Sequence, residues 1–491
     1  MTVTAAPPAA VGASPTLVSV VLALAGLEGR KMLTHPVTWL GALGATGMAV
    51  FELREQAPVL NRVSVTLAWT MLPLAAATAL VAGWAVLRTR GRTDAHPPAI
   101  MPLGIGPRVG GVVVGLWFPA VATFAIQLGL LVWVMTRDPV TSMVWTEALA
   151  GPVHVLFAGA LGAALTRWLP HPSTPLFAVL VLVGLMIAFP YDQSNWGREI
   201  GLEWMSPLAR PQDIIPYEVA FRPAGLHLGY LAGLGLIAAG IAMLSRHRAV
   251  WIVLGLGVIA AATLGPAQLG QIEESRRVET MSRLVGDQAD LTCENHDGVV
   301  YCAMPGYEGW IDEWAAAAKP VLEAAPPDAA DGIEIRQYPV HTTFLLDGND
   351  YNNWWWIEPA YQDYISRDVV PVGSIWSNYS SSSVAMDATS KVMGCEPACD
   401  GQSQQVAYLW LASHHPEIRL IVEGNVSSDG APLADCMVAE LWSKPEAEQL
   451  IRPNWGFLSN SETSYEEAAE ILGVSVPIGY DENGRFQNGC P

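Results

Sequence analysis

The first 292 residues of the chain contain no cysteine, and every cysteine lies beyond residue 290. Disulfides form and persist in oxidising compartments. This distribution therefore predicts an extracytoplasmic environment for the C-terminal part of the chain. The six residues are Cys293, Cys302, Cys395, Cys399, Cys436 and Cys490.

Several motifs of nucleotide-binding and hydrolytic enzymes are also absent. No Gly-x4-Gly-Lys-Ser/Thr loop occurs, so the chain does not bind ATP in the P-loop manner. There is no His-Glu-x-x-His signature of a zinc peptidase and no Gly-x-Ser-x-Gly elbow of a serine hydrolase. Adjacent His414 and His415 cannot face one metal from a helix, and Pro416 follows them. We expect no catalytic, cofactor or metal site on this chain.

Charge is scarce in the first half and mostly acidic in the second. Residues 270–491 hold 11 of the 26 Lys and Arg and 35 of the 46 Asp and Glu, a net charge of −24. Residues 1–269 hold the other 15 and 11, a net charge of +4, and the two add to −20. The acidic half would repel phosphates, which argues against a nucleic-acid partner. Arg outnumbers Lys 22 to 4, which hints at a GC-rich bacterial genome.

What fills the first half is a series of long apolar runs. A membrane-spanning helix needs about 20 mostly apolar residues, and no Asp, Glu, Lys or Arg lies near the middle of these runs. We therefore predict a transmembrane domain over residues 37–269. Its seven expected spans are 37–52, 63–87, 109–135, 148–166, 174–190, 224–244 and 249–268.

Residues 1–36 contain a shorter apolar run, Leu17–Leu27, followed by Glu28-Gly29-Arg30-Lys31. Eleven residues suit a helix that lies on the membrane better than one that crosses it. A signal peptide is the alternative, but no basic residue precedes the run and Glu28-Gly29-Arg30 is a poor cleavage site. We expect a cytoplasmic N-terminus with an interfacial helix.

The charges of the connecting loops predict the orientation. With the N-terminus in the cytoplasm, the inner pieces carry nine Lys and Arg against six in the outer loops, in the sense of the positive-inside rule. Seven spans then place residues 270–491 outside the plasma membrane, where the cysteines also indicate that they lie.

A hairpin is predicted at CENHDGVVYC, from Cys293 to Cys302. Asp297-Gly298 is the two-residue signal of a type I′ turn. Folding about it pairs Cys293 with Cys302 at a non-hydrogen-bonded site, where Cα atoms lie about 4.5 Å apart, within disulfide range. Two small buried residues are the alternative. Three disulfides, with Cys395–Cys399 and Cys436–Cys490 completing the set, are the simplest expectation; zinc at Cys395-x3-Cys399 is less favoured because zinc ribbons use closer CxxC pairs.

Three features occur in a distinctive order along residues 15–245. EGRKMLTHPVTWLG precedes the first span, a basic loop RTRGRTDAHPPAIMPLGIGPR joins the second and third, and the long YDQSNWGREIGLEWMSPLARPQDIIPYEV joins the fifth and sixth. In this order the chain resembles the membrane permease of ABC exporters of the type V fold, the drug, polysaccharide and antibiotic exporter class. The seventh span and the large C-terminal domain depart from that family; exporter permeases of actinobacteria look similar in this respect.

The resemblance implies a permease that forms a homodimer or pseudo-dimer in the bacterial plasma membrane. It also implies a separate P-loop ATPase subunit, which would carry ATP and Mg, with no cofactor on this chain. The alternative for the same basic residues is binding of anionic membrane lipid. The ATPase-coupling surface implied by position consists of Glu28, Arg30, Lys31, Arg88, Arg90, Arg92 and Arg108.

Residues 270–491 are expected to form an extracytoplasmic α/β domain. Residues 333–346 and 419–426 are rich in β-branched residues and predict strands. Residues 305–326 predict a helix, and Ser464, Glu467 and Gly473 predict the start and stop of another. Residues 324–332 and 377–383 are expected to be loops.

Aromatic residues cluster in this domain, and their role has two interpretations. Trp354, Trp355, Trp356 and Trp376 could form an outer binding face, or they could be core residues and membrane-interface anchors. The sequence favours an ABC exporter permease; a membrane-anchored surface receptor or assembly protein and a membrane-tethered hydrolase remain as alternatives.

Overall fold

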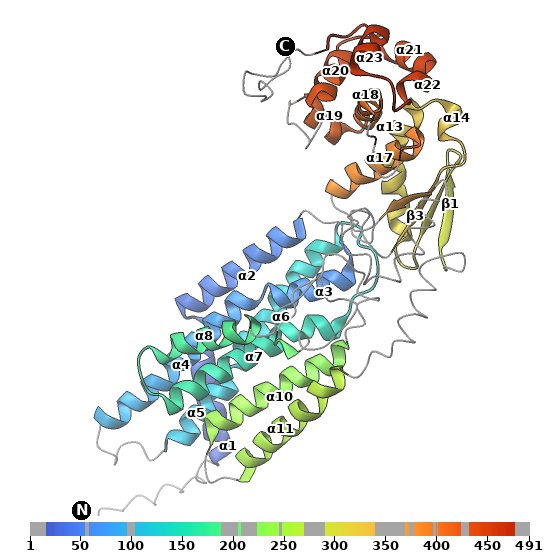
Figure 1. Ribbon diagram of the computed structural model, residues 1–491. Coiled ribbons are helices and arrows are strands. Elements are labelled where there is room, and N and C mark those ends of the chain that lie inside the picture. Colours follow the sequence, from blue (N-terminus) through green and yellow to red (C-terminus); the bar gives the residue numbers. More distant parts are fainter. Residues whose placement is uncertain are drawn as a thin grey trace, which may run out of the picture.

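The computed structural model describes most of the chain in two units (Figure 1). Helices between residues 16 and 269 form an N-terminal bundle, and residues between 290 and 476 form a C-terminal unit. The described residues are 16–54, 58–95, 104–187, 205–207, 223–244, 248–269, 290–338, 369–372, 378–395, 399, 401–423 and 432–476.

Five continuous or nearly continuous helical segments of the bundle are long and apolar enough to cross a membrane. They coincide with five of the seven predicted spans and run side by side in Figure 1. The bundle helices are α1 (Leu17–Leu33), α2 (Pro36–Arg54), α3 (Leu60–Trp69), α4 (Leu72–Ala95), α5 (Ile105–Gly115), α6 (Trp117–Met135), α7 (Trp145–Trp168), α8 (Thr174–Ile187), α10 (Ala224–Met243) and α11 (Arg248–Leu269).

Helices also occupy the other two predicted runs, but neither is among those five segments. At about 1.5 Å per residue, the 14 described residues of α8 extend about 21 Å, less than the roughly 30 Å of a hydrocarbon core. Helix α2 has 19 residues and carries Glu52 and Arg54 in its last turn. The structure thus supports a largely helical, multi-span architecture with at least five candidate spans.

Two of the five segments are interrupted. Residues Thr70 and Met71 separate α3 from α4, shortly before Pro73, and Leu116 separates α5 from α6, shortly before Pro119. Proline cannot donate the helical hydrogen bond and disfavours helical geometry in the residue before it. Each break therefore follows from a proline inside an apolar run.

Small residues set the closest contacts between the long helices. A Cβ atom on Gly41 of α2 would lie 2.5 Å from Cβ of Ala77 on α4, and one on Gly162 of α7 would collide with the carbonyl oxygen of Ala79. Glycine and alanine let helix backbones approach closely where lipid offers no hydrophobic driving force. Apolar side chains such as Leu74 and Val155 fill the rest of the core. Close packing of apolar and small residues therefore holds the bundle together.

The C-terminal unit contains a four-stranded sheet in the order β1-β2-β3-β4. β1 and β2 are antiparallel, and β2, β3 and β4 are parallel. The hairpin register is the predicted one, from His296 opposite Val299 to Cys293 opposite Cys302, and both turn residues have positive φ (54° for Asp297 and 92° for Gly298). The strands are β1 (Thr292–His296), β2 (Val299–Ala303), β3 (Glu334–Gln337) and β4 (Val369–Val372).

Helices make up the rest of this unit, and three predictions about them are wrong. Residues 324–332 are not entirely a loop, because α14 (Pro327–Ala330) lies within them, with Pro327 in the first helical position that suits proline. Residues 419–426 do not form a strand, because α19 (Pro416–Glu423) occupies the described part of them, and residues 377–383 are not a loop, because α17 begins at Asn378. Helices α17 and α19 each bury an apolar stripe, and this packing outweighs the local preference of their residues for loop or strand. The remaining elements are η3 (Glu308–Trp310), α13 (Ile311–Ala324), α14 (Pro327–Ala330), α17 (Asn378–Met393), α18 (Gln402–Ala412), α20 (Pro432–Trp442), α21 (Ala447–Ile451), η5 (Arg452–Asn454), α22 (Trp455–Leu458) and α23 (Tyr465–Leu472).

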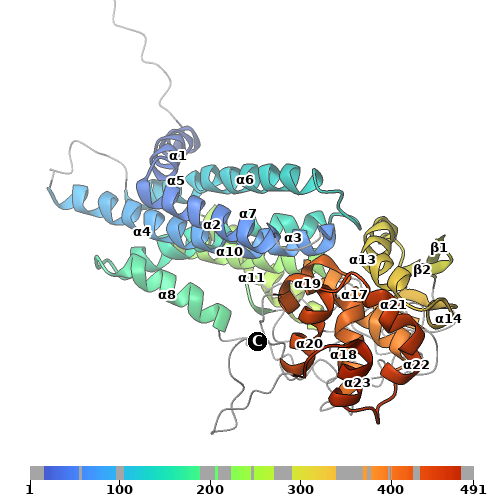
Figure 2. The same ribbon diagram turned by 90° about the horizontal axis from the view of Figure 1, so that it is seen from above.

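The two units meet at one end of the bundle, whereas α1 lies toward the opposite end in both views (Figures 1 and 2). At the junction Val59 and Val140 form a short parallel bridge between the start of α3 and the connector from α6 to α7. Both valines belong to the same buried cluster as Tyr301, Trp310 and the rest of the C-terminal core. The core of the C-terminal unit therefore extends onto the end of the bundle.

Candidate coupling surface

The candidate site is the region where α1, the end of α4 and the start of α5 come together. Helix α1 begins at Thr16, whose hydroxyl accepts a 3.3 Å hydrogen bond from the amide of Ser19. It ends with Arg30 and Lys31 in its last turn, where positive charge offsets the partial negative charge of the helix C-terminus. Both views show α1 inclined to the long helices (Figures 1 and 2). The sequence-predicted elbow is therefore a helix with a basic end.

Helix α1 is packed on the bundle through small residues. A Cβ atom on Gly115 of α5 would lie 3.0 Å from the carbonyl oxygen of Ala25 and 3.0 Å from the amide nitrogen of Gly29. One on Gly111 would lie 2.6 Å from Cβ of Leu24. The four-residue spacing of Gly111 and Gly115 matches that of Ala25 and Gly29, so one stripe on each helix forms the contact. A push on α1 would be transmitted directly to the backbone of α5.

Glu28 connects the end of α1 to the end of α4. Its carboxylate lies 2.7 Å from Nζ of Lys31, one turn along α1, and 3.7 Å from a terminal guanidinium nitrogen of Arg88 on α4. The Glu28 side chain is only 13% exposed, whereas those of Lys31 and Arg88 are about half exposed (42% and 50%). A largely buried acid between two partly exposed bases is held in place better than an ordinary surface ion pair.

Arg108 makes the corresponding link between α4 and α5. Its guanidinium donates a 3.4 Å hydrogen bond to the carbonyl oxygen of Thr89. Arg30 is exposed on α1. Arg90 and Arg92 lie on α4, which continues to Ala95, so these arginines are on a helix rather than in a loop; their side chains are outside the described part of the chain. Five of the seven predicted coupling residues thus have described side chains, and four of these, Glu28, Lys31, Arg88 and Arg108, make ion pairs or hydrogen bonds at this surface.

His35, between α1 and α2, also belongs to the site, although the sequence analysis did not single it out. Its Nδ1 accepts a 3.2 Å hydrogen bond from the amide of Val37, and its ring centroid lies 5.6 Å from that of Trp84 on α4. Burial, and next the positive charge of Arg88, lower the pKa of His35 below its usual 6.5. No local sequence signal marks His35, because its contact with Trp84 joins positions 49 residues apart.

The arrangement is suited to binding an acidic surface. Arg30, Lys31, Arg88 and Arg108 carry four positive charges, and Glu28 is the one acid among the residues whose side chains are described here. Partly exposed guanidinium groups bind carboxylates and phosphates in bidentate fashion. The surface can therefore bind the carboxylates of a soluble protein or the phosphates of lipid headgroups.

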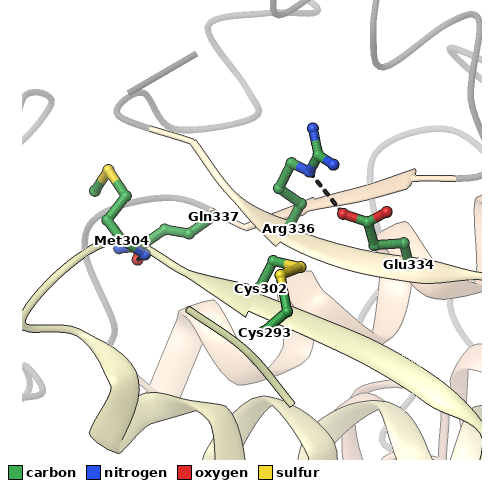
Figure 3. Close-up of a disulfide and its surroundings, with 6 residues drawn as sticks. All are labelled: Cys293, Cys302, Met304, Glu334, Arg336 and Gln337. Atoms are coloured by element: carbon green, nitrogen blue, oxygen red, sulfur yellow. Dashed lines mark hydrogen bonds and ion pairs between the residues drawn. A yellow bond between two sulfur atoms is a disulfide. The ribbon is translucent and has the colours of Figure 1, made fainter. Parts of the chain in front are cut away.

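The cysteines form a second group of predicted residues. A disulfide joins Cys293 to Cys302 with their Cα atoms 4.1 Å apart, and another joins Cys395 to Cys399. Cys436 is also disulfide-bonded, while Cys490, its expected partner, lies outside the described residues. Figure 3 shows the first disulfide between β1 and β2, with the 2.6 Å ion pair of Arg336 and Glu334 on neighbouring β3.

The predicted aromatic face cannot be described in the same way. Trp354, Trp355, Trp356 and Trp376 all lie outside the described residues. Within the described ranges, no group of three or more His, Cys, Asp and Glu side chains could hold a metal ion. The ring of His414 instead lies against Trp410 and Trp442, at centroid distances of 4.5 and 4.9 Å, which gives this histidine a packing role.

A cavity of about 400 Å³ beside the hairpin was not foreseen. It lies between the tip of β1–β2 and α13, and it has charged groups around an apolar floor. Lys319 forms a 2.7 Å ion pair with Asp297 at its edge, and burial raises the pKa of Tyr301, on its wall, to about 12. Its polar lining consists of four acids, one lysine and one histidine: Asp297, Asp312, Glu323, Asp331, Lys319 and His296.

No family model, curated protein or solved structure matches this chain. The function must therefore be argued from the geometry and chemistry of the chain itself.

Proposed function

We propose that this chain is the membrane-spanning permease subunit of an ATP-driven ABC exporter. The observation that carries the proposal is the position of Glu28, whose ion pairs tie the elbow helix α1 to the end of α4. That contact joins the elbow to the arginine-rich end of the second predicted span. These are the two segments that an exporter's ATPase would push.

The apolar helices and the missing nucleotide loop support this proposal. A bundle with five segments able to cross a membrane needs an energy source if it moves molecules against a gradient. Its sequence contains no P-loop and no Asp, Glu, Lys or Arg near the middle of the predicted spans for ion coupling. A separate P-loop ATPase, bringing ATP and Mg, would supply that energy.

In this proposal the coupling surface faces the cytoplasm and the C-terminal unit lies outside the plasma membrane. Seven spans would give that arrangement, and the disulfides fit an oxidising exterior. Two permeases, as a homodimer or pseudo-dimer, would enclose the translocation path. Closure of the ATPases would move α1 and the end of α4 together, because Glu28 and the glycine contacts join them to α5.

Purification of the full-length chain in mild detergent tests the proposal. A P-loop ATPase should accompany it at one copy per permease. The triple variant Arg88→Glu/Arg90→Glu/Arg92→Glu should weaken this complex and leave the elution volume of the permease unchanged. The proposal fails if no ATPase accompanies the chain under any mild condition, or if the permease alone transports substrate down an ion gradient.

A charge swap separates the ion pair from the general basicity of the surface. Glu28→Arg places a cation beside Lys31 and Arg88 and should reduce ATP-dependent transport. Adding Arg88→Glu restores an opposite-charge pair and should recover much of the loss. Arg30→Glu is the comparison for surface charge alone, because Arg30 is exposed on the same helix turn and its change leaves the Glu28–Arg88 contact in place; any loss that it causes should not be recovered by adding Arg88→Glu.

The cavity beside the hairpin favours a second candidate, a membrane-anchored receptor whose C-terminal unit binds a ligand. Its lining contains four acids and one lysine, which suits a cationic ligand. Lys319→Ala would remove the cation at its edge and should strengthen binding of a cationic ligand. If the chain bound such a ligand with no effect of ATP or of the triple arginine variant, the receptor function would replace the exporter.

A further inference from the structure

The interior of the bundle contains two polar side chains that the coupling surface does not explain. Gln127 of α6 is 3% exposed, and His154 of α7 is completely buried. Both ring nitrogens of His154 and Oε1 of Gln127 have no hydrogen-bond partner within the described structure. Buried polar groups are normally paired, because leaving one unpaired costs free energy. Three unpaired atoms on two neighbouring helices therefore require an explanation.

The Gln127 side chain reaches from α6 to the face of α7 that also carries His154. The amide nitrogen of Gln127 occupies the space that a Cβ atom on Gly151 would need. His154 follows Gly151 by three residues. Positions three residues apart are neighbours on a helix surface, about 5–6 Å from each other. Gly151, having no side chain, leaves the room in which Gln127 reaches α7.

The same place is where the second predicted span is interrupted. Nε2 of Gln127 donates a 3.1 Å hydrogen bond to the carbonyl oxygen of Leu67, which lies one turn before the break between α3 and α4. The amide of Met71, which would bond to Leu67 in a continuous helix, donates to Ala68 instead at 3.3 Å. Pro152 on α7 supplies no amide hydrogen to its own helix. Broken helices at mid-bundle are how transport proteins expose backbone groups to a ligand.

We propose that Gln127 and His154, beside the break between α3 and α4, form a binding site for an uncharged, hydroxyl-bearing molecule. A neutral imidazole has one donor and one acceptor, and Oε1 of Gln127 is an acceptor. One hydroxyl group can accept from the imidazole N–H and donate to Oε1 of Gln127, and a second can donate to the other ring nitrogen, so a molecule with two hydroxyl groups satisfies all three atoms. No Asp, Glu, Lys or Arg lies within one helical turn of Gln127 on α6 or of His154 on α7, and the nearest acid on α7 is Glu147, seven residues before His154, so a charged group would find no countercharge in the site itself. The inference goes beyond the proposed function, because the site needs no ATPase.

Thiol labelling of the full chain in lipid nanodiscs tests both access and chemistry. The first 292 residues contain no cysteine, and the described residues contain no free thiol. Single variants His154→Cys and Gln127→Cys, each keeping the other residue, would be treated with three methanethiosulfonates of similar size: hydroxyethyl, trimethylammonium-ethyl and sulfonatoethyl. Ala158→Cys is the matched control, because Ala158 is fully buried one turn further along α7.

The hydroxyethyl reagent should label both site variants at least tenfold faster than Ala158→Cys, and the two charged reagents should label them no faster than the control. Equal rates for site and control positions would overturn the proposal and leave an enclosed water or plain packing. Labelling by the charged reagents as fast as by the hydroxyethyl reagent would also overturn it, because the site would then not select uncharged molecules.

A second measurement does not depend on a reactive cysteine. His154→Leu removes two unpaired nitrogens from an apolar interior, so the melting temperature of the bundle should rise. A fall would show that the imidazole is paired in the native protein and has a structural role, which contradicts the proposal. Both experiments use the chain without an ATPase, so their outcome is distinguishable from failure of the exporter function.

Discussion

The backbone amide of Thr141 donates a 2.8 Å hydrogen bond to the carbonyl oxygen of Gly306. Thr141 lies in the connector from α6 to α7, and Gly306 lies in the turn after β2, so this bond joins the bundle to the C-terminal unit. Thr141 and nearby Asp138 have positive φ angles of 65° and 47°. Such conformations cost non-glycine residues about 1–3 kcal/mol each, and they persist only where surrounding contacts hold the backbone in place. The C-terminal unit therefore holds the connector in a conformation that it would not adopt alone.

Val140→Ala should destabilise the C-terminal unit by about 2 kcal/mol, because the Val140 side chain is 5% exposed and packs in the core of that unit. Differential scanning calorimetry of the full chain should show a lower melting temperature for that unit. Val132→Ala is the control, since Val132 is 67% exposed on α6. An unchanged melting temperature in Val140→Ala would mean that the two units do not share a core.

Arg88→Gln should raise the pKa of His35, because the charge of Arg88 is one of the two causes that lower it. Burial is the larger cause, so the pKa should stay below its usual value. ¹³C-labelled histidine NMR would measure the shift. Arg30→Gln should leave this pKa unchanged, and an equal rise in both variants would show that surface charge in general sets it.

The same pKa predicts how the elbow responds to pH. A histidine whose folded-state pKa lies below its unfolded value of about 6.5 favours the neutral form in the folded state. Its contribution to stability is complete above pH 6.5 and falls as the pH drops through that value toward the lower folded pKa. The protection factors of α1 amides, which correct the exchange rates for the intrinsic effect of pH, should therefore be lower at pH 5 than at pH 7.5. His35→Gln should flatten this dependence, and an unaltered pH profile in that variant would exclude His35 as its source.

Removing the hairpin disulfide should destabilise the C-terminal unit by about 2.5 kcal/mol, the loop-closure entropy expected for a loop of this length. The variant is Cys293→Ser/Cys302→Ser, and urea unfolding followed by far-UV circular dichroism would measure it. Non-reducing mass spectrometry of the native protein should recover the two cysteines in one linked peptide. Free thiols at both positions would contradict the pairing and the extracytoplasmic location together.

Asp435→Asn should stabilise the protein at neutral pH. Burial of Asp435, near the start of α20, raises the pKa of its carboxyl group to about 6. The folded state thus favours the protonated acid, so stability is lost as the pH rises from about 4 to about 6 and stays lower above that range. The neutral amide removes this loss, and the melting temperature at pH 7.5 should rise by a few degrees. Asp328→Asn on exposed α14 should have no effect; a rise there as large as at Asp435 would implicate net charge instead.

Features fixed by neighbouring residues were predictable. The hairpin register followed from Asp297-Gly298, because the turn type alone sets which residues face each other. Helix α23 begins at the capping box of Ser464 and Glu467 and ends at Gly473 with φ 60°. In each case the interaction spans a few residues, so its signal is contained in a short stretch of sequence.

Features that depend on packing between distant segments were not predictable. Residues 419–426 have strand-like composition, yet Ile418 and Val422, four residues apart, are buried together on one face of α19 while Leu420 is 70% exposed. The basic residues of the candidate site were located by composition, but the pairing of Glu28 with Arg88 depends on how helices 60 residues apart are placed. The two helix breaks, by contrast, had a local signal in the prolines at positions 73 and 119.

Helix α11 differs from the other long helices because only 11% of its apolar window is buried within the protein. Among the described elements its substantial contact is with α10, where Gly233, Gly240 and Gly257 let the two backbones approach. Within the described structure this helix is therefore attached to the bundle chiefly through one neighbour. Its removal would reverse the end of the bundle from which the rest of the chain emerges. This one helix thus determines from which end of the bundle residues 270–491 follow, a segment that has a net charge of −24 and contains all six cysteines.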